Sequence, residues 1–438
     1  MISSESSVCC SKSEVELEHT RIFQEVVLDA SYEKCLPIAP VDQSTLIEYS
    51  IPAKSERYVD AANSQLRVVV KIFKADGTAI DNTDDVALAN NCMHTLFDSI
   101  TLEINGTTVT SASTDYGLRA YMENLLSFGK EAKDGLLSSI GWKADYHGQM
   151  EPHANNTGYQ TRKGYTSLSR EYDMMGPLHL DMFQQHKYIL RGVPLRLVLT
   201  RSADRKCLLT PAANNENYKI VFQKCELYLR VATLSESVRL QHEHMLNNSR
   251  PAGYGLKRVN LKTFSVPAGK FDHSIDDAGS GELPQSAVIG FLDNESHNGN
   301  YHKNPFNFKH FDIRSLALIR NGQQIPTSAY EPIFQPANAT RFVREYLSLF
   351  EVTGKSQSDE GMDISRAAYG SGYTLFGFNL RPDLSDGETE QPHQKGNLRL
   401  EVKFGTALPN AITVVIFLVM DNHVLIYRNG NIVLDFTL

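Results

Sequence analysis

The two halves of the chain carry the same local signals in the same order, and this duplication restricts the fold more than any other feature. Asn105-Gly106 and Asn321-Gly322 each lie among alternating apolar residues. Asn-Gly between such runs is the strongest short signal for a β-hairpin, because both residues tolerate the positive φ angles of a tight turn. Each half is therefore predicted to contain a hairpin at the equivalent place.

Two more matches follow the hairpins. Segments 118–128 and 342–350 have apolar residues three and four positions apart, which predicts an amphipathic helix in each half. Segments 192–200 and 396–404 then resemble each other as strands near the end of each half. The matched hairpins and helices are separated by a little over two hundred residues, far longer than a solenoid repeat. Three matches in one order indicate a duplicated domain.

Most of the remaining pattern is that of short strands. Alternating or β-branched runs lie at 65–73, 99–109, 194–200, 218–231, 315–325, 396–404, 412–420 and 423–436, and the last contains another Asn-Gly pair, Asn429-Gly430. Many short strands with turn signals and few helices predict an all-β chain of sandwiches or barrels. Eight strands in two Greek keys make a jelly roll, but this pattern alone indicates two β-sandwiches without fixing their wiring. Long loops are expected at 143–175 and 272–310.

The chain length of 438 residues exceeds that of one ordinary domain and fits two. We expect a flexible, Ser-rich and acidic N-terminal arm at 1–20, a first sandwich at 21–240, a linker at 241–257 and a second sandwich at 258–438. The linker prediction depends on a polar stretch that contains Pro251 and Gly253.

Charge and composition argue against several functional classes. The formal net charge is −8 and no Lys/Arg-rich run occurs, so the chain is not expected to bind nucleic acid sequence-specifically or by neutralising phosphates. The six cysteines include no Cys-X-X-Cys pair, which favours free thiols in a reducing compartment. No secretory signal is expected. The longest apolar run, 412–420, is far shorter than the roughly 20 residues of a membrane-spanning helix.

Three short motifs resemble parts of metal sites. The segment 242–244 (His-Glu-His) has the His-X-His spacing of cupins, but the Glu that completes such a site does not follow, so solvated linker histidines are expected. His179 with Asp181, and His310 with Asp312, each match the His-X-Asp part of a facial iron triad. With 14 histidines in the chain, about one such match is expected by chance.

Three carboxylates also gather at Asp81, Asp84 and Asp85. The segment lacks the Gly and the distal Glu of an EF-hand loop. A capped turn that enters a short helix at 86–94 is expected, since Asp favours helix starts, with calcium between neighbouring subunits as the alternative. No phosphate-binding GxxxxGK[ST] loop and no Gly-X-Ser-X-Gly motif occur. No catalytic, cofactor-binding or metal-binding residue is predicted, and the chain is not expected to be an enzyme.

The segment 90–142 contains NNCMHTLFDSITLEINGTTV, then TDYGLRAYMENLLSFGKEAKDGLL and a final GW. It resembles the first jelly roll of the major capsid proteins of Polinton (Maverick) elements and adintoviruses, with 97–106 and 121–129 as the most specific parts. The resemblance implies two tandem eight-stranded jelly rolls, a double jelly roll, with a few short helices in the loops. This layout covers nearly the whole chain after the first twenty or so residues.

The resemblance also implies the function of a major capsid protein. Three copies would form a homotrimer with a pseudo-hexagonal outline, and trimers would tile the icosahedral capsid of a virion around double-stranded DNA. The implied partners are neighbouring trimers and penton and minor capsid proteins, assembled in the nucleus or cytoplasm of a host cell, with no cofactor.

Two alternatives stay open. A jelly-roll carbohydrate-binding protein is expected to be a monomer or small oligomer, usually with a secretory signal. A non-heme metal-dependent enzyme is expected to hold stoichiometric iron or manganese, which changing His179 or His242 to Ala would remove.

Overall fold

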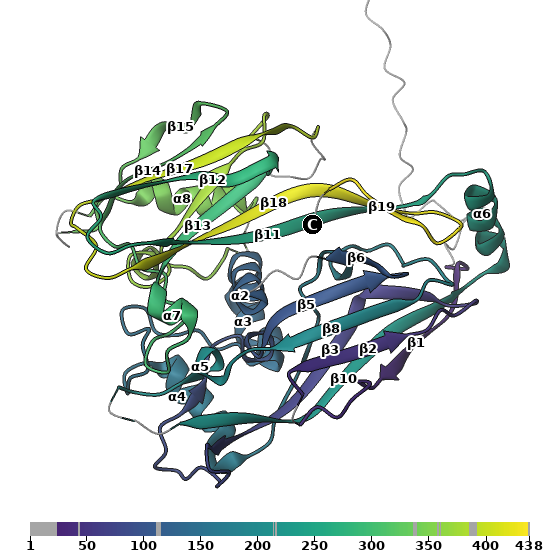
Figure 1. Ribbon diagram of the computed structural model, residues 1–438, viewed down its shortest axis with the longest axis horizontal. Coiled ribbons are helices and arrows are strands. Elements are labelled where there is room, and N and C mark those ends of the chain that lie inside the picture. Colours follow the sequence, from purple (N-terminus) through teal and green to yellow (C-terminus); the bar gives the residue numbers. More distant parts are fainter. Residues whose placement is uncertain are drawn as a thin grey trace, which may run out of the picture.

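The computed structural model describes residues 24–42, 44–110, 115–212, 214, 217–335, 340–356, 359, 361–384 and 392–436 (Figure 1). The predicted N-terminal arm at 1–20 lies outside these residues. Two β-sandwiches lie one above the other in Figure 1, with the helices α2 (Tyr116–Ser127) and α3 (Lys130–Asp134) between them.

The first half of the chain forms two four-stranded antiparallel sheets. One sheet has the order β1 (Val27–Cys35), β10 (Tyr218–Leu234), β3 (Tyr58–Lys74) and β7 (Tyr172–Gly176). The other has the order β2 (Leu46–Ile51), β8 (Leu195–Arg201), β5 (Phe97–Ile104) and β6 (Thr107–Thr110). A separate small pair joins β4 (Ala87–Leu88) to β9 (Leu208–Leu209). The eight main strands, counted along the chain, therefore pair as 1-8-3-6 and 2-7-4-5, which is the wiring of a jelly roll.

The second half repeats this wiring. One sheet has the order β11 (Ala252–Val266), β18 (Ile412–Ile426), β13 (Ser286–Asp293) and β16 (Leu375–Asn379), and β19 (Ile432–Leu434) also pairs with β18. The other has the order β12 (Asp272–Glu282), β17 (Lys395–Phe404), β14 (Ile313–Arg320) and β15 (Gln323–Tyr330). Counted along the chain, the eight main strands again pair as 1-8-3-6 and 2-7-4-5. The prediction of two tandem jelly rolls is confirmed.

The helices are short and lie in the connections. The described helices of the first roll are α1 (Cys92–Thr95), α2, α3, η1 (Leu136–Ile140), α4 (Thr157–Thr166), η2 (Ser167–Ser169), η3 (Asp181–Phe183) and α5 (Asp204–Cys207). The helix α6 (Glu236–Asn247) leads to the second roll, which contains α7 (Asn294–Asn298), α8 (Val343–Val352) and α9 (Arg366–Tyr369). The helices α2 and α8 occupy equivalent places, each after the fifth main strand of its roll, as the matched helical patterns predict.

The Asn-Gly hairpins also form as predicted. The φ angles are 48° and 76° at Asn105-Gly106, and 50° and 84° at Asn321-Gly322. Both turn residues therefore adopt the left-handed conformation that a two-residue hairpin of the twisted type requires. These turns join β5 to β6 and β14 to β15. The matched sequence signals thus correspond to the same hairpin in each jelly roll.

Several loop and helix predictions are wrong. The segment 272–310, expected to be a loop, contains the strands β12 and β13. The sequence of β12 (DHSIDDAGSGE) has no apolar alternation, whereas β13 (SAVIGFLD) is almost wholly buried and so shows none either. The segment 143–175 is not one long loop, since it contains α4, η2 and most of β7. The expected helix at 86–94 is instead β4 followed by the single turn α1.

The connection between the rolls is more ordered than its polar composition predicts. Residues 241–257 comprise the end of α6, a short turn and the first residues of β11. The strand expected to begin near Val259 begins at Ala252. None of the residues of α6 is fully buried, and the helix lies at one end of the molecule in Figure 1. An exposed helix has a mixed polar sequence, which is why this segment resembles a linker.

The helix α8 packs closely against the strand β16. A Cβ atom added to Gly377 on β16 would lie 2.6 Å from the carbonyl oxygen of Ser348 on α8. We expect Gly377→Ala to lower the free energy of unfolding by about 1–3 kcal/mol, because helix and strand must move apart. Thermal denaturation measures this change. Gly164→Ala in α4 is the matched control, since a Cβ there meets nothing within 4 Å, and an equal loss in both variants would contradict the close contact.

Candidate functional site

Buried aromatic and polar side chains meet at the contact between the two jelly rolls, which we call the seam. An aromatic stack crosses it: the ring of Tyr121 on α2 lies 3.9 Å from that of Phe306 and 5.1 Å from that of Trp142, measured between centroids. Tyr121 and Trp142 belong to the first half, whereas Phe306 belongs to the second. All three side chains are buried, and the buried apolar residues of both rolls form one continuous cluster. The two rolls therefore share a core.

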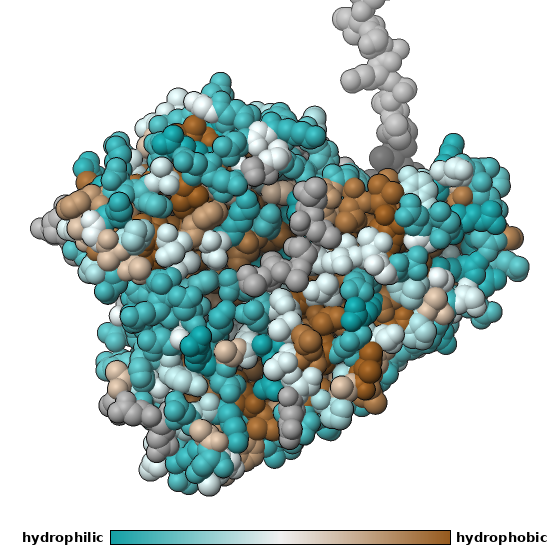
Figure 2. Space-filling model, viewed as in Figure 1, coloured by the Kyte–Doolittle hydropathy of each residue, from teal (hydrophilic) through white to brown (hydrophobic). Residues whose placement is uncertain are grey.

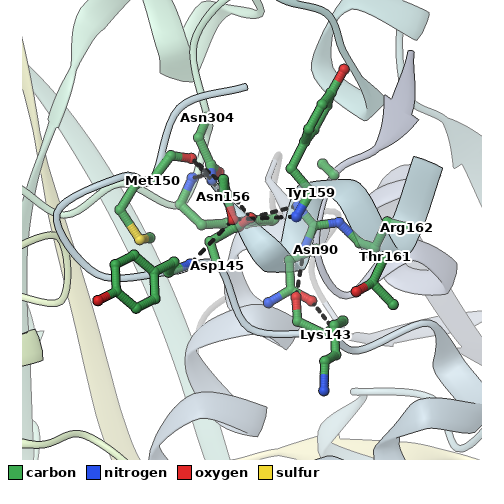
Figure 3. A network of polar contacts seen from close by, with 12 residues as sticks. Asn90, Lys143, Asp145, Met150, Asn156, Tyr159, Thr161, Arg162 and Asn304 are labelled. Carbon is green, nitrogen blue, oxygen red and sulfur yellow. Dashed lines mark hydrogen bonds and ion pairs between the residues drawn. The ribbon is translucent and has the colours of Figure 1, made fainter. Parts of the chain in front are cut away.

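A buried polar network lies beside this stack (Figure 3). The carboxylate of Asp145 accepts hydrogen bonds from Asn156 at 2.8 Å, from Arg162 at 2.7 Å and from Asn304 at 2.8 Å. Asn304 comes from the second half of the chain and also donates to the carbonyl oxygen of Met150 at 2.7 Å. All four polar side chains are buried. Because a buried charge is tolerated only when it is paired and hydrogen-bonded, this arrangement fixes the relative position of the two halves.

The guanidinium of Arg162 and the cap of α4 hold the network in place. Arg162 is on α4, and its Nε donates to the carbonyl oxygen of Leu88 at 2.8 Å. The side chain of Asn156 caps the same helix, accepting from the backbone N–H of Tyr159 at 3.2 Å. Figure 3 shows Asn156 and Arg162 directed toward Asp145. The helix α4 thus positions two of the three donors to the carboxylate.

A second buried cluster surrounds Arg119 on α2. Its guanidinium contacts Glu123 at 2.7 Å and Asp181 at 2.6 Å. Asp181 also accepts the backbone N–H of Val259 on β11 at 3.2 Å, and Glu123 contacts the ring of His179. This cluster therefore joins α2 and the segment around η3 to the first strand of the second roll.

The charges of this cluster determine its ionisation. Burial alone would raise the pKa of the Glu123 carboxyl, but Arg119 and His179 reverse this effect and lower the pKa to about 2. Burial, with His179 beside it, lowers the pKa of His94 well below its usual value. His94 contacts the hydroxyl of Tyr116 at 3.0 Å. A carboxylate held ionised between a guanidinium and an imidazole ring forms a buried ion pair, and Glu123, His179 and His94 lie in the lining of a groove between the rolls.

The motif residues His179 and Asp181 belong to this cluster and do not form an iron triad. His179 is turned to Glu123, whereas Asp181 is paired with Arg119. Their contacts are thus directed to different partners. The pair His310 and Asp312 forms a local turn, in which the ring nitrogen of His310 accepts the backbone N–H of Asp312 at 2.9 Å.

The side chains of the His-Glu-His segment also do not point to a common metal position. It lies on α6, where neighbours two residues apart face different directions. His242 contacts the hydroxyl of Tyr58 at 3.0 Å, Glu243 pairs with Arg191, and His244 contacts Asn248 at 3.3 Å. The prediction that these histidines are solvated linker residues is wrong for His242, whose ring packs edge-on against Tyr58.

The carboxylates at 81–85 form ion pairs and hydrogen bonds with other residues of the chain. Asp84 pairs with Lys74 at 3.2 Å, and one of its oxygens accepts the backbone N–H of Asp81 at 2.6 Å. Asp85 accepts from the hydroxyl of Tyr159 at 2.9 Å and pairs with Lys163 at 3.0 Å. Asp81 and Asp84 thus close a turn, but no helix starts at 86, so the predicted helix cap is wrong.

A groove of about 980 Å³ runs along the seam. Its apolar lining comes from both halves: Leu126, Ile140, Leu178, Val259, Val288 and Val419. Sequence reasoning missed the seam, because its partners are far apart in the chain; Asp145 and Asn304 are 159 residues apart. The apolar spacing at 118–128 indicated a buried helix face, which includes Tyr121, but nothing in the sequence marked Arg119 as buried, since charged residues are usually exposed.

A strip of exposed apolar side chains lies on the first roll. Of the fifteen most exposed large apolar residues in the described part of the chain, six fall within 26–46: Val26, Leu28, Tyr32, Leu36, Ile38 and Leu46. The strands β1 and β2 in this segment are edge strands of their sheets. Brown, apolar areas interrupt the teal surface around β2 and β8 in Figure 2. We call this segment the β1–β2 strip. Among the described residues, no helix has the length and apolar character needed to cross a membrane.

No family model matches the chain. The chain is 23% identical over 376 residues to a protein of Caenorhabditis elegans described as "Uncharacterized protein F54H12.2", and the match covers 83% of this chain and 86% of that protein.

Solved structures give a clearer result. A chain of the Sputnik virophage, solved by cryo-electron microscopy, superimposes with a TM-score of 0.65 at 13% identity, covering 98% of this chain and 93% of that one. The mavirus major capsid protein matches with a TM-score of 0.55 at 11% identity over 100% and 97% of the two chains. The Faustovirus major capsid protein matches with a TM-score of 0.58 at 10% identity over 93% and 92%. The chain therefore has the double jelly-roll fold of these viral major capsid proteins.

Proposed function

We propose that this protein is the major capsid protein of a double-stranded DNA virus or virus-like element of the Polinton (Maverick) and adintovirus type. Three copies form a pseudo-hexagonal homotrimer, and trimers tile an icosahedral virion shell around the DNA. The observation that carries the proposal is the identical wiring of the two rolls over nearly the whole chain, in common with viral capsid proteins. Two similar jelly rolls in each chain give six jelly rolls in a trimer, and these six can contact six neighbouring trimers.

The proposed role is structural and not catalytic. His179 and Asp181 face different partners, as do His242 and His244, and His310 accepts the backbone N–H of Asp312, so none of these motifs gathers its side chains as a ligand set. The contacts at the seam hold the two rolls as one unit. A shell subunit requires this, because both rolls must contact neighbouring subunits in a fixed geometry. The net charge of −8 keeps free subunits soluble and suits a wall that encloses DNA without binding it.

The proposal includes the domain division and the partners. An arm at 1–20 and a first roll at 21–240 are followed by a linker, which ends where β11 begins the second roll at Ala252 and not at the expected residue 257. The partners are neighbouring trimers and penton and minor capsid proteins, assembled inside a host cell. Electron microscopy of the purified protein tests the proposal: single particles with a hexagonal outline, or shells and sheets built from them, support it. Particles of the size and shape of one chain would contradict it.

The β1–β2 strip supplies a surface for contact between copies. Edge strands with exposed apolar side chains pair readily with other chains unless they are covered. Here Leu28 on β1 is 66% exposed and Leu46 on β2 is 52% exposed. A permanent assembly covers such side chains, since its interfaces are large and more apolar than the remaining surface.

We therefore expect the double substitution Leu28→Glu with Leu46→Glu to break the assembly into single chains, because two buried carboxylates at an interface lack partners. Light scattering after size exclusion measures the loss of assembled mass, and circular dichroism checks that the fold is retained. Phe271→Glu, at a residue that is 60% exposed and outside the strip, is the matched control. Retained assembly in the double variant would show that the strip lies outside the interfaces.

A further inference from the structure

A cluster of metal-ligating side chains lies at the C-terminal end of the second roll, apart from the seam. His393 precedes β17, His423 is on β18 and Asp435 follows β19. One ligand atom from each of the three lies within 4.8 Å of the others. We infer that these three residues bind a divalent transition-metal ion of the zinc type, which fastens the C-terminal strand to the second roll.

The carboxylate of Asp435 is oriented for a ligand role. Its Oδ1 accepts the backbone N–H of His423 at 2.8 Å. Its Oδ2 lies 3.5 Å from Nδ1 of His423 and 3.7 Å from Nε2 of His393. One oxygen is thus fixed by the backbone while the other faces both imidazole rings. Two imidazole nitrogens and one carboxylate oxygen around a common point form a set that suits zinc, with a further position left for water or another ligand.

An outer carboxylate orients the ring of His393. Its Nδ1 lies 2.6 Å from Oε1 of Glu282, so the N–H donates to the carboxylate and Nε2 is left directed toward Asp435. Asn422 in turn donates to both oxygens of Glu282, at 3.0 Å and 2.9 Å. A carboxylate that holds the second nitrogen of a ligating histidine is the usual outer partner in zinc sites, where it fixes the tautomer and raises ligand basicity.

Two carboxylates and one guanidinium set the local charge. Arg258 lies 3.8 Å from Glu282, packs over the ring of Phe436 at 4.5 Å and also interacts electrostatically with Asp435. Glu282 and Asp435 together carry one more negative charge than Arg258 balances, which favours a cation beside Asp435. The side chains of His393, His423 and Asp435 are 43%, 37% and 33% exposed, so an ion reaches them from solvent. This position at the surface fits an ion that bridges segments of the chain.

Such an ion would clamp a segment that also touches the first roll. The turn between β18 and β19 reaches the first hairpin, where the side-chain amide of Asn105 donates to the carbonyl oxygen of Gly430 at 2.8 Å. β19 pairs with β18 over only three residue pairs. A metal that joins Asp435 to the segment before β17 would stabilise this short strand and, through it, the contact between the rolls.

The test uses the full chain, treated with a chelator and then dialysed. Titration with ZnCl₂ by calorimetry is expected to give one equivalent per chain, and saturating zinc is expected to raise Tm by at least about 4 °C. Co²⁺ is expected to give the visible absorption of a coordinated ion. His393→Gln and His423→Gln are each expected to abolish these changes, and Glu282→Gln to weaken zinc binding by about 10–100-fold. His153→Gln, at an exposed histidine elsewhere, is the matched control and is expected to behave as the unchanged chain.

No binding of zinc, or binding that survives both histidine substitutions, would overturn the inference. His393 lies outside a regular strand, so His393→Gln keeps the test valid if His423→Gln fails to fold. The measurement needs no assembly, and a negative result would leave the proposed capsid role untouched.

Discussion

Arg162→Met is expected to lower the free energy of unfolding by about 3–5 kcal/mol, because it removes one partner of a fully buried ion pair. The side chains of Arg162 and Asp145 are 0% and 1% exposed. Without the guanidinium, the carboxylate keeps only the amide donors Asn156 and Asn304 and carries an uncompensated charge. The backbone oxygen of Leu88 also loses the donor at 2.8 Å.

Urea denaturation followed by tryptophan fluorescence measures the loss of unfolding free energy with a probe that lies at the seam. The chain has one tryptophan, and Trp142 lies in the aromatic stack of the seam. Lys163→Met is the matched control, since Lys163 is the next residue of α4 and forms a partly exposed pair with Asp85. This control is expected to cost less than about 1 kcal/mol. Equal losses in the two variants would show that the buried network does not hold the seam.

The second large effect is expected for Arg119→Met. The substitution leaves Glu123 and Asp181 buried without their shared guanidinium, which is expected to cost about 3–5 kcal/mol near neutral pH. Arg196→Met is the matched control, because Arg196 also pairs with two carboxylates, Glu48 and Glu103, but on the exposed surface. A much smaller loss is expected there.

The pH dependence of the unfolding free energy distinguishes the electrostatic effect of Arg119 from its packing. The folded pKa of Glu123, about 2, lies below its ordinary value of 4.5, so its contribution to stability is present above about pH 4.5 and is lost as pH falls toward 2. In Arg119→Met the main opposing charge is gone and burial raises the pKa of Glu123. The difference in unfolding free energy between the two proteins is therefore expected to narrow between pH 7 and pH 4. A difference that stays constant with pH would mean that Arg119 acts through packing alone.

Local features of the fold could be predicted from sequence, and features made by distant contacts could not. The Asn-Gly hairpins and the helices α2 and α8 were predictable because their signals lie within a few residues. The strand β12 was not, because its exposed and glycine-rich sequence lacks alternation. The edge strands β1 and β2 were also missed, since their exposed apolar residues obscure the difference between inner and outer faces.

The same limit applies to the sites. Asp145 and Asn304 meet across 159 residues of chain, and nothing near either residue marks the other as its partner. His393, His423 and Asp435 come from three separate segments, and no short spacing joins them. By contrast, His179 and Asp181 have a suggestive spacing, yet Arg119 and Glu123, 62 and 56 residues away, decide their roles. Short motifs therefore suggested metal ligands, whereas the tertiary contacts show that these residues form ion pairs.

The native mass of the purified protein, from light scattering after size exclusion, shows whether the chain assembles as a capsid subunit is expected to. A trimer is expected, with three times the chain mass of 49.0 kDa, and its mass should not change on moderate dilution because the interfaces of a shell subunit are large. A single species with the mass of one chain at all concentrations would contradict the capsid role, since the two jelly rolls of one chain would then be the whole functional unit.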